Sequence, residues 1–139
     1  MPNWTREQLT AITDRGHSLI VCAAAGSGKT AVLVNRIAQL VSEGCPIEQM
    51  LVVTFTNAAA SEMRQRIGEA LLSAAADNPA LAGEVSALSR ASISTLHRFC
   101  GSLLREHFEA LGVDPSFRIA DEQESTVLSQ QAMDDALYA

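Results

Sequence analysis

The sequence predicts an α/β fold in which helices flank a parallel sheet. Three short apolar runs, at residues 18–23, 50–54 and 91–94, have the length and the β-branched content of buried strands. A stretch with helical periodicity follows each run, and strands that alternate with helices at this spacing form parallel sheets. The chain of 139 residues is long enough for one compact domain, and its 47% of apolar residues argues against disorder.

The first predicted helix covers residues 5–14. Thr5 is suited to be its N-cap, and Gln8, three residues later, completes a capping box. Glycines bound the apolar run at 18–23, which is typical of a buried strand. The next helix, at residues 29–42, is apolar on most sides and is therefore expected to be buried, and a glycine and a proline follow its end.

The second half of the chain repeats the strand–helix pattern. The run at 50–54 precedes a long helix at 57–76, and a short polar helix is expected before Arg90. The run at 91–94 precedes an amphipathic helix that ends near residue 111. The apolar stripe of the long helix consists of Met63, Ile67, Leu71 and Ala74.

Composition limits the class of protein. The net charge of −6 does not fit a protein that coats DNA generally, although it does not exclude DNA contact at a local groove. No apolar run reaches the length of roughly 18 residues that suggests a membrane span, and the N-terminus lacks a signal pattern. The three cysteines form no Cys-x-x-Cys pair, which favours reduced thiols, two of them in the core. We therefore expect a cytoplasmic protein.

The strongest chemical signal lies between the predicted strand at 18–23 and the helix at 29–42. Glycines let backbone N–H groups turn inward around a phosphate, and the N-terminus of the helix adds its positive end. Lys29 would reach the β- and γ-phosphates, and the hydroxyl of Thr30 would ligate Mg²⁺. The segment reads Ala23, Ala24, Ala25, Gly26, Ser27, Gly28, Lys29 and Thr30. It departs from the strict phosphate-loop pattern at Ala23, and a glycine-rich turn without a ligand is the alternative.

The segments around this loop carry a family resemblance. Gln8, residues 23–30, residues 53–63 and residues 93–100 resemble the Q motif and motifs I, Ia and Ib of UvrD-like superfamily 1 helicases, in the same order and at the family spacing. Residues 91–97 and 117–122 are more similar to the helicase–nuclease branch of that family than to UvrD or RecB. The resemblance covers nearly the whole chain. It implies a P-loop (RecA-like) ATP-binding domain whose N-terminal part is residues 1–120, with residues 121–139 opening a helical insertion of the 1B type.

The resemblance also implies residue roles. Gln8 would bind the adenine edge, Lys29 the phosphates and Thr30 the Mg²⁺ ion. Residues that follow the second and third strands would line a groove for single-stranded DNA, namely Phe55, Thr56, Asn57, Thr95 and His97. An aromatic ring at a strand end stacks on any base without reading sequence, which suits a motor.

Several of these residues have a plainer interpretation. Gln8 would serve only the capping box, and Phe55 would be a core residue because it shares strand parity with Val53. Arg64 and Arg66 would contact phosphates or form an ordinary solvated helix face. The acidic run that begins at Asp121 resembles a metal-binding motif. We interpret Asp121 and Glu124 instead as the N-cap and N3 residues of the last helix, because no strongly apolar strand precedes them.

The functional expectation is therefore an ATP-binding portion of a 3′→5′ DNA helicase, the helicase–nuclease subunit of a complex that acts in double-strand break repair and recombination. A partner subunit is implied by the family alone. Because ATP hydrolysis also needs a metal-binding carboxylate, a water-orienting residue and usually an arginine, this stretch is expected to bind ATP and Mg²⁺ without turnover or unwinding. The alternatives are another UvrD- or RecB-type helicase and an ATP-binding module without a motor.

Overall fold

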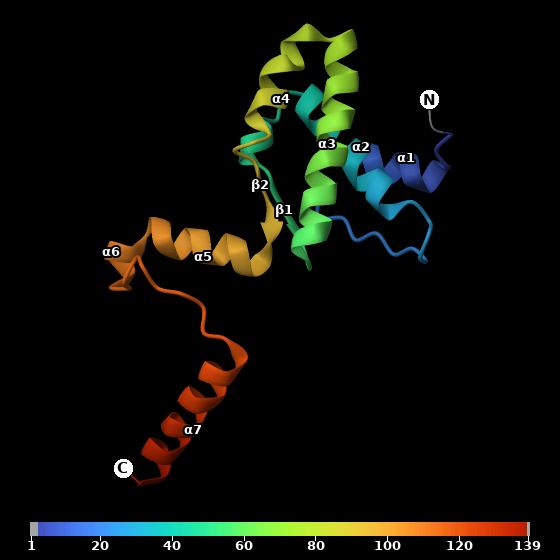
Figure 1. Ribbon diagram of the computed structural model, residues 1–139. Coiled ribbons are helices and arrows are strands. Elements are labelled where there is room, and N and C mark those ends of the chain that lie inside the picture. Colours follow the sequence, from blue (N-terminus) through green and yellow to red (C-terminus); the bar gives the residue numbers. More distant parts are fainter. Residues whose placement is uncertain (1–2, 139) are drawn as a thin grey trace. The chain divides into compact units, whose positions relative to one another are not determined.

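The computed structural model describes residues 3–138, and the α/β class predicted from the sequence is confirmed. Within these residues the sheet has two parallel strands, β1 (Leu51–Thr54) and β2 (Ser92–Thr95). Leu51 lies opposite Ser92, and Thr54 lies opposite Thr95. The connection between the strands contains the long helix α3 (Asn57–Asp77), as a parallel pair requires (Figure 1).

The helices begin close to the predicted residues because local signals set their ends. Thr5 caps α1 in a complete capping box, Gly28 caps α2, and Thr56 caps α3. The helix predicted to end near residue 111 divides in two at His107. The remaining elements are α1 (Arg6–Thr13), α2 (Lys29–Ser42), α4 (Ala82–Ala87), α5 (Leu96–Glu106), α6 (Phe108–Leu111), α7 (Glu122–Tyr138), and the 3-10 turns Ile47–Gln49 and Pro79–Leu81.

The strand predicted at residues 18–23 is wrong. The segment is extended on its way to the glycine loop, but it pairs with neither β1 nor β2. Ile20 is 87% exposed, whereas a buried strand would cover it. An apolar run becomes a strand only when a neighbouring strand accepts and donates its backbone hydrogen bonds, and within residues 3–138 this run pairs with neither edge of the two-stranded sheet.

The core lies where α3 packs against α2 and the sheet (Figure 1). Three of the four residues in the predicted stripe, Met63, Ile67 and Leu71, are buried there, and Ala74 is partly buried against them. Val52 and Ile93 supply the buried side of the two strands. A smaller cluster of Ala11, Ile12 and Val32, with Trp4 against it, joins α1 to α2. These two clusters fix the helices that carry the candidate site.

The substitution Ile67→Ala is expected to lower the free energy of unfolding by about 2–5 kcal/mol, because it leaves a cavity in a close-packed core. Ile67 has no exposed surface. The change is measured by urea denaturation, with Leu72→Ala as the control on the same helix. Leu72 is 59% exposed, so its truncation is expected to stay within about 0.5 kcal/mol of the wild type. A loss below that limit for Ile67→Ala would contradict this packing.

The chain divides into two compact units, one up to Cys100 and one from Gly101 onward. In the second unit the guanidinium of Arg105 lies 4.6 Å from the centre of the Phe117 ring. The predicted cap of α7 is confirmed, since Glu124 N donates to Asp121 Oδ1 at 2.9 Å and Asp121 N donates to Glu124 Oε2 at 3.2 Å. No helix formed by residues 3–138 has the length and hydrophobicity needed to cross a membrane.

Candidate nucleotide-binding site

The glycine loop has the backbone conformation that its sequence predicts. Gly26 and Gly28 have φ angles of +77° and +81°, in the left-handed region where an L-residue costs about 1–2 kcal/mol more than glycine. Ser27 closes the turn, with its backbone N 3.3 Å and its Oγ 2.7 Å from the carbonyl oxygen of Ala24. Gly28 then caps α2, so the loop leads directly into the N-terminus of a 14-residue helix.

Lys29, the first residue of α2, folds back over this loop. Its Nζ donates to the carbonyl oxygens of Ala23 at 2.8 Å and Ala24 at 2.7 Å. It is the single lysine in the sequence. The ammonium group therefore lies beside the loop amides and the positive end of the helix, where an anion would be attracted by all three.

Gln8 joins the first helix to the glycine loop. Its Oε1 accepts from Thr5 N at 2.9 Å, and its own backbone N donates to Thr5 Oγ1 at 3.3 Å, which confirms the capping box. Its Nε2 donates to the carbonyl oxygen of Ser27 at 3.2 Å. The side chain thus serves the cap and touches the loop at once, while its contact with adenine stays a prediction.

Polar contacts hold α1 in this position. Arg36 on α2 donates to the carbonyl oxygen of Ala11 at 2.7 Å. Arg15 donates to the Ile12 carbonyl at 2.7 Å and pairs with both carboxylate oxygens of Glu43 at 3.0 and 3.1 Å. The hydrogen bond from Arg15 lowers the pKa of Glu43. These contacts tie the end of α1 to the middle and the C-terminal end of α2, and they hold Gln8 beside the loop.

The loop and α1 enclose a pocket of about 310 Å³, the lower end of the range for small-molecule sites. Cys22 lines this pocket. Its thiol was predicted to lie in the core, but it is exposed because residues 18–23 pair with neither β1 nor β2. Cys100, the other thiol expected in the core, is also exposed. Glu7 and Val21 also line the pocket and were not predicted from the sequence. They belong to the site only because α1 packs beside the loop, and no sequence motif indicates that contact. The lining residues are Thr5, Glu7, Gln8, Ala11, Val21, Cys22, Ala23, Ser27, Lys29 and Val32.

The donor chemistry fits Mg²⁺ bound together with a nucleotide. Thr30 is exposed on the first turn of α2, and hydroxyl and phosphate oxygens are the hard donors that Mg²⁺ prefers. Residues 3–138 contain no cluster of three or more His, Cys, Asp or Glu side chains placed to hold a metal.

The residues predicted to contact DNA gather at the carboxyl ends of the two strands. Phe55, directly after β1, is fully exposed, and Val53 on the same face is 44% exposed. The Oγ1 of Thr56 accepts from Ala59 N at 3.1 Å as the cap of α3, and Asn57 is exposed. Phe55 and Val53 share one environment, as their strand parity predicts, but both side chains are exposed rather than buried.

The end of β2 supplies the rest of this group. Thr95 is only 9% exposed, and its Oγ1 accepts from Arg98 N at 3.3 Å at the start of α5. His97 is exposed on the first turn of that helix. Because Thr54 and Thr95 are partners in the parallel register, α3 and α5 begin side by side at one edge of the sheet.

The two arginines of α3 differ in their surroundings. Arg66 is exposed and pairs with Glu62 one turn away. Arg64 is half-buried and donates to three backbone carbonyl oxygens, those of Leu88, Ala91 and Ile93. The interpretation of Arg64 as part of an ordinary solvated helix face is therefore wrong, because its guanidinium is engaged within the fold, while its contact with phosphate stays a prediction.

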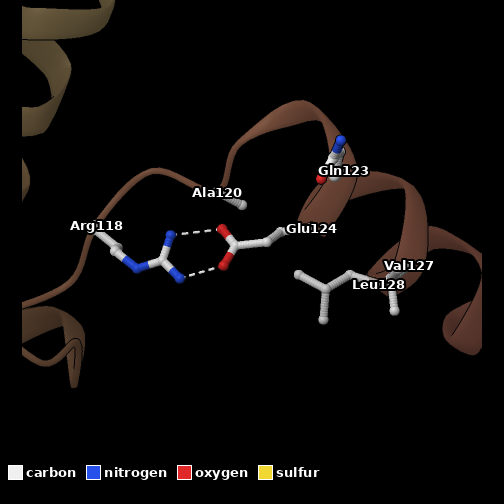
Figure 2. Close-up of a pocket in the computed structure, with 6 residues that line it drawn as sticks. All are labelled: Arg118, Ala120, Gln123, Glu124, Val127 and Leu128. Carbon is white, nitrogen blue, oxygen red and sulfur yellow. Dashed lines mark hydrogen bonds and ion pairs between the residues drawn. The ribbon is translucent and has the colours of Figure 1, made fainter.

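A second pocket, of about 520 Å³, belongs to the unit that begins at Gly101 and contains none of the predicted site residues (Figure 2). Arg118 faces Glu124 across it through a pair of hydrogen bonds, and Val127 and Leu128 form its apolar side. The hydrogen bond from Arg118 lowers the pKa of Glu124. This arrangement braces the start of α7 and brings together no chemistry that acts on a nucleotide.

The fold and the glycine loop agree with a family comparison. The sequence model of the family described as UvrD/REP helicase N-terminal domain matches residues 4–138. The chain belongs to this family. Within it, the chain is about half identical to AddA-type sequences over nearly its whole length, which confirms the predicted branch.

Three relatives show the extent of this similarity, and all three carry the name of an ATP-dependent helicase/nuclease subunit. The protein from Oceanobacillus iheyensis is 54% identical over 99% of this chain. Those from Desulforamulus reducens and Clostridioides difficile are 52% and 47% identical over 95% and 96% of it. The chain spans only 11–12% of the length of these relatives.

Proposed function

We propose that this chain is the ATP-binding part of a DNA helicase and that ATP with Mg²⁺ binds at the glycine loop. The observation that carries the proposal is the meeting of three elements at one pocket: Gln8 of α1, the loop turned by Gly26 and Gly28, and Lys29 at the N-terminus of α2. In this interpretation residues 1–120 form the N-terminal part of a P-loop (RecA-like) domain, and residues 121–139 begin a helical insertion.

The phosphates would bind where the loop meets α2. The ammonium of Lys29 would exchange its two neutral carbonyl acceptors for phosphate oxygens, which adds the attraction between opposite charges to the hydrogen bond. The free N–H groups at the start of α2 would add to this attraction. Thr30 would hold Mg²⁺ against the β- and γ-phosphates.

The base would lie toward α1. The amide of Gln8 has one donor group and one acceptor, and adenine presents the complementary pair on its amino and ring nitrogen edge. To bind adenine, Nε2 would leave the carbonyl of Ser27. Binding of the base would therefore change a contact of the same loop that holds the phosphates.

Single-stranded DNA would cross the carboxyl edge of the sheet. The exposed ring of Phe55 would stack on a base, and the adjacent N-termini of α3 and α5 would face phosphates. Thr56, Asn57, Thr95 and His97 lie around these two helix starts.

The whole protein is proposed from its relatives. Their shared name refers to a helicase, to a nuclease and to one subunit of a complex, and each relative is much longer than this chain. By this similarity the intact protein is an AddA-type ATPase that moves 3′→5′ along single-stranded DNA beside an AddB-type partner. It would cut DNA with a nuclease domain and act in double-strand break repair and recombination. A UvrD- or RecB-type helicase is the less favoured interpretation, because the identity to AddA-type relatives extends over nearly the whole chain.

The chain by itself is proposed to bind ATP without hydrolysing it. Asp121 and Glu124 are engaged in capping α7, and ATP hydrolysis needs a metal-binding carboxylate and a water-orienting residue besides the loop. The test is a titration of the 139-residue chain with a fluorescent ATP analogue and Mg²⁺, together with a phosphate-release assay with and without single-stranded DNA. Saturable binding without release is expected. Release stimulated by DNA would contradict the capping role, and a folded chain that binds no nucleotide would favour a module whose loop is structural.

A further inference from the structure

We infer that Arg64 is a positioning residue that fixes the two DNA-contacting segments, residues 55–57 and 95–97, relative to one another. This inference rests on the proposed function, since it concerns how the DNA groove is held. It assigns to Arg64 no direct contact with DNA or nucleotide.

The guanidinium of Arg64 bridges two parts of the chain that are distant in sequence. Its Nη1 donates to the carbonyl oxygen of Leu88 at 2.5 Å, and its Nη2 donates to those of Ala91 at 3.3 Å and Ile93 at 3.0 Å. The planar fork of an arginine allows one side chain to reach several acceptors at once. The three acceptors belong to the end of α4 and the segment that becomes β2.

The carbonyl oxygens that accept from Arg64 lie close in sequence to the segment 95–97, and Arg64 itself follows the segment 55–57. Arg64 lies about two turns after Asn57, the first residue of α3 and the last of the segment 55–57. Ile93 lies two residues before Thr95, where β2 ends and α5 begins. The guanidinium therefore joins the helix that follows one segment to the strand that precedes the other.

A displacement of β2 would move residues 95–97 relative to residues 55–57, because α5 follows β2 directly. The two strands are only four residues long, and Thr54 lies opposite Thr95 at their last position. With so short a ladder, the three hydrogen bonds from Arg64 act together with the core packing of Ala91 and Ile93 to hold the start of β2 against α3. Without them the first turn of α5, which carries His97, would lose its fixed distance from Phe55.

The test compares variants of the 139-residue chain in binding a labelled oligo(dT) and a fluorescent ATP analogue, at a temperature where every variant is folded. Arg64→Met is expected to weaken oligo(dT) binding by about fivefold or more and to change ATP binding by less than about twofold. Arg64→Lys should give an intermediate DNA affinity, because one ammonium cannot reproduce the fork.

Two variants control for other effects of the substitution. Ile67→Ala truncates a buried side chain about one turn further along the same helix and leaves the Arg64 side chain itself unchanged. Arg90→Met removes a positive charge from the loop between the acceptors, where Arg90 pairs with Glu48. Both controls should bind oligo(dT) within about twofold of the wild type.

The possible outcomes separate this inference from the proposed function. If Arg64→Met binds oligo(dT) as the wild type does, Arg64 has only a structural role and the inference is overturned. The inference is also overturned if Arg64→Met and Ile67→Ala both lose the binding of oligo(dT) and ATP together. If the wild type binds ATP but no oligo(dT), the proposed DNA edge is wrong, and the role of Arg64 is overturned with it. If Arg64→Met alone loses oligo(dT) binding while ATP binding persists, the inference is supported.

Discussion

Replacing Lys29 with Ala is expected to weaken the binding of Mg²⁺–ATP by about 10- to 150-fold, because a hydrogen bond to a charged group contributes about 1.5–3 kcal/mol. The ammonium already lies at the loop, held by the Ala23 and Ala24 carbonyls, so its transfer to phosphate needs little movement. The measurement is the titration with a fluorescent ATP analogue, repeated with the variant. Unfolding of the variant is recorded in parallel.

The control for this prediction is Arg90→Ala, which removes an equal charge from an exposed ion pair with Glu48. Its affinity for the nucleotide should equal that of the wild type. An equal loss of affinity in both variants would mean that net charge, and not the position of Lys29, attracts the nucleotide. Unchanged binding by Lys29→Ala would show that the phosphates do not bind at the loop.

Replacing Phe55 with Ala is expected to weaken the binding of single-stranded DNA by about 5- to 150-fold, because stacking on an aromatic ring contributes about 1–3 kcal/mol per base. The fold should not suffer, since the ring is 103% exposed and contributes nothing to the core. The affinity is measured by fluorescence anisotropy with labelled oligo(dT) at low ionic strength, where phosphate contacts are least screened.

Two variants serve as controls for Phe55→Ala. Phe55→Trp keeps a stacking surface and should retain most of the affinity. Tyr138→Ala removes another exposed ring, 88% accessible on α7, and should leave DNA binding unchanged. A fall in thermal stability of Phe55→Ala, with no change in DNA affinity, would restore the interpretation of Phe55 as a core residue.

The parts of the fold that could be predicted are those decided by neighbouring residues. The start of α2 after Gly28, the capping box between Thr5 and Gln8, and the cap of α7 all depend on contacts within four residues. The apolar stripe of α3 follows from helical periodicity in the same way. The strands β1 and β2 lie where two of the apolar runs predicted them, and each is the parallel partner of the other.

The parts that could not be predicted depend on contacts between distant residues. Residues 18–23 have the composition of a strand, but pairing requires a neighbour that composition does not supply. The contact of Gln8 with Ser27 spans 19 residues, and those of Arg64 with Leu88 and Ile93 span 24 and 29. No periodicity signals such contacts, so Gln8 had two open interpretations and Arg64 was assigned to the surface.

The most direct test of the central claim, that ATP places its phosphates on Lys29, uses the fact that the sequence contains a single lysine. An acyl-phosphate derivative of ATP transfers its acyl group to an amine held beside the terminal phosphate, and peptide mass spectrometry locates the product. Acylation of Lys29 that excess Mg²⁺–ATP suppresses is the predicted result. Acylation confined to the N-terminal amine, or a Lys29 label that ATP leaves unchanged, would contradict a nucleotide site at this loop.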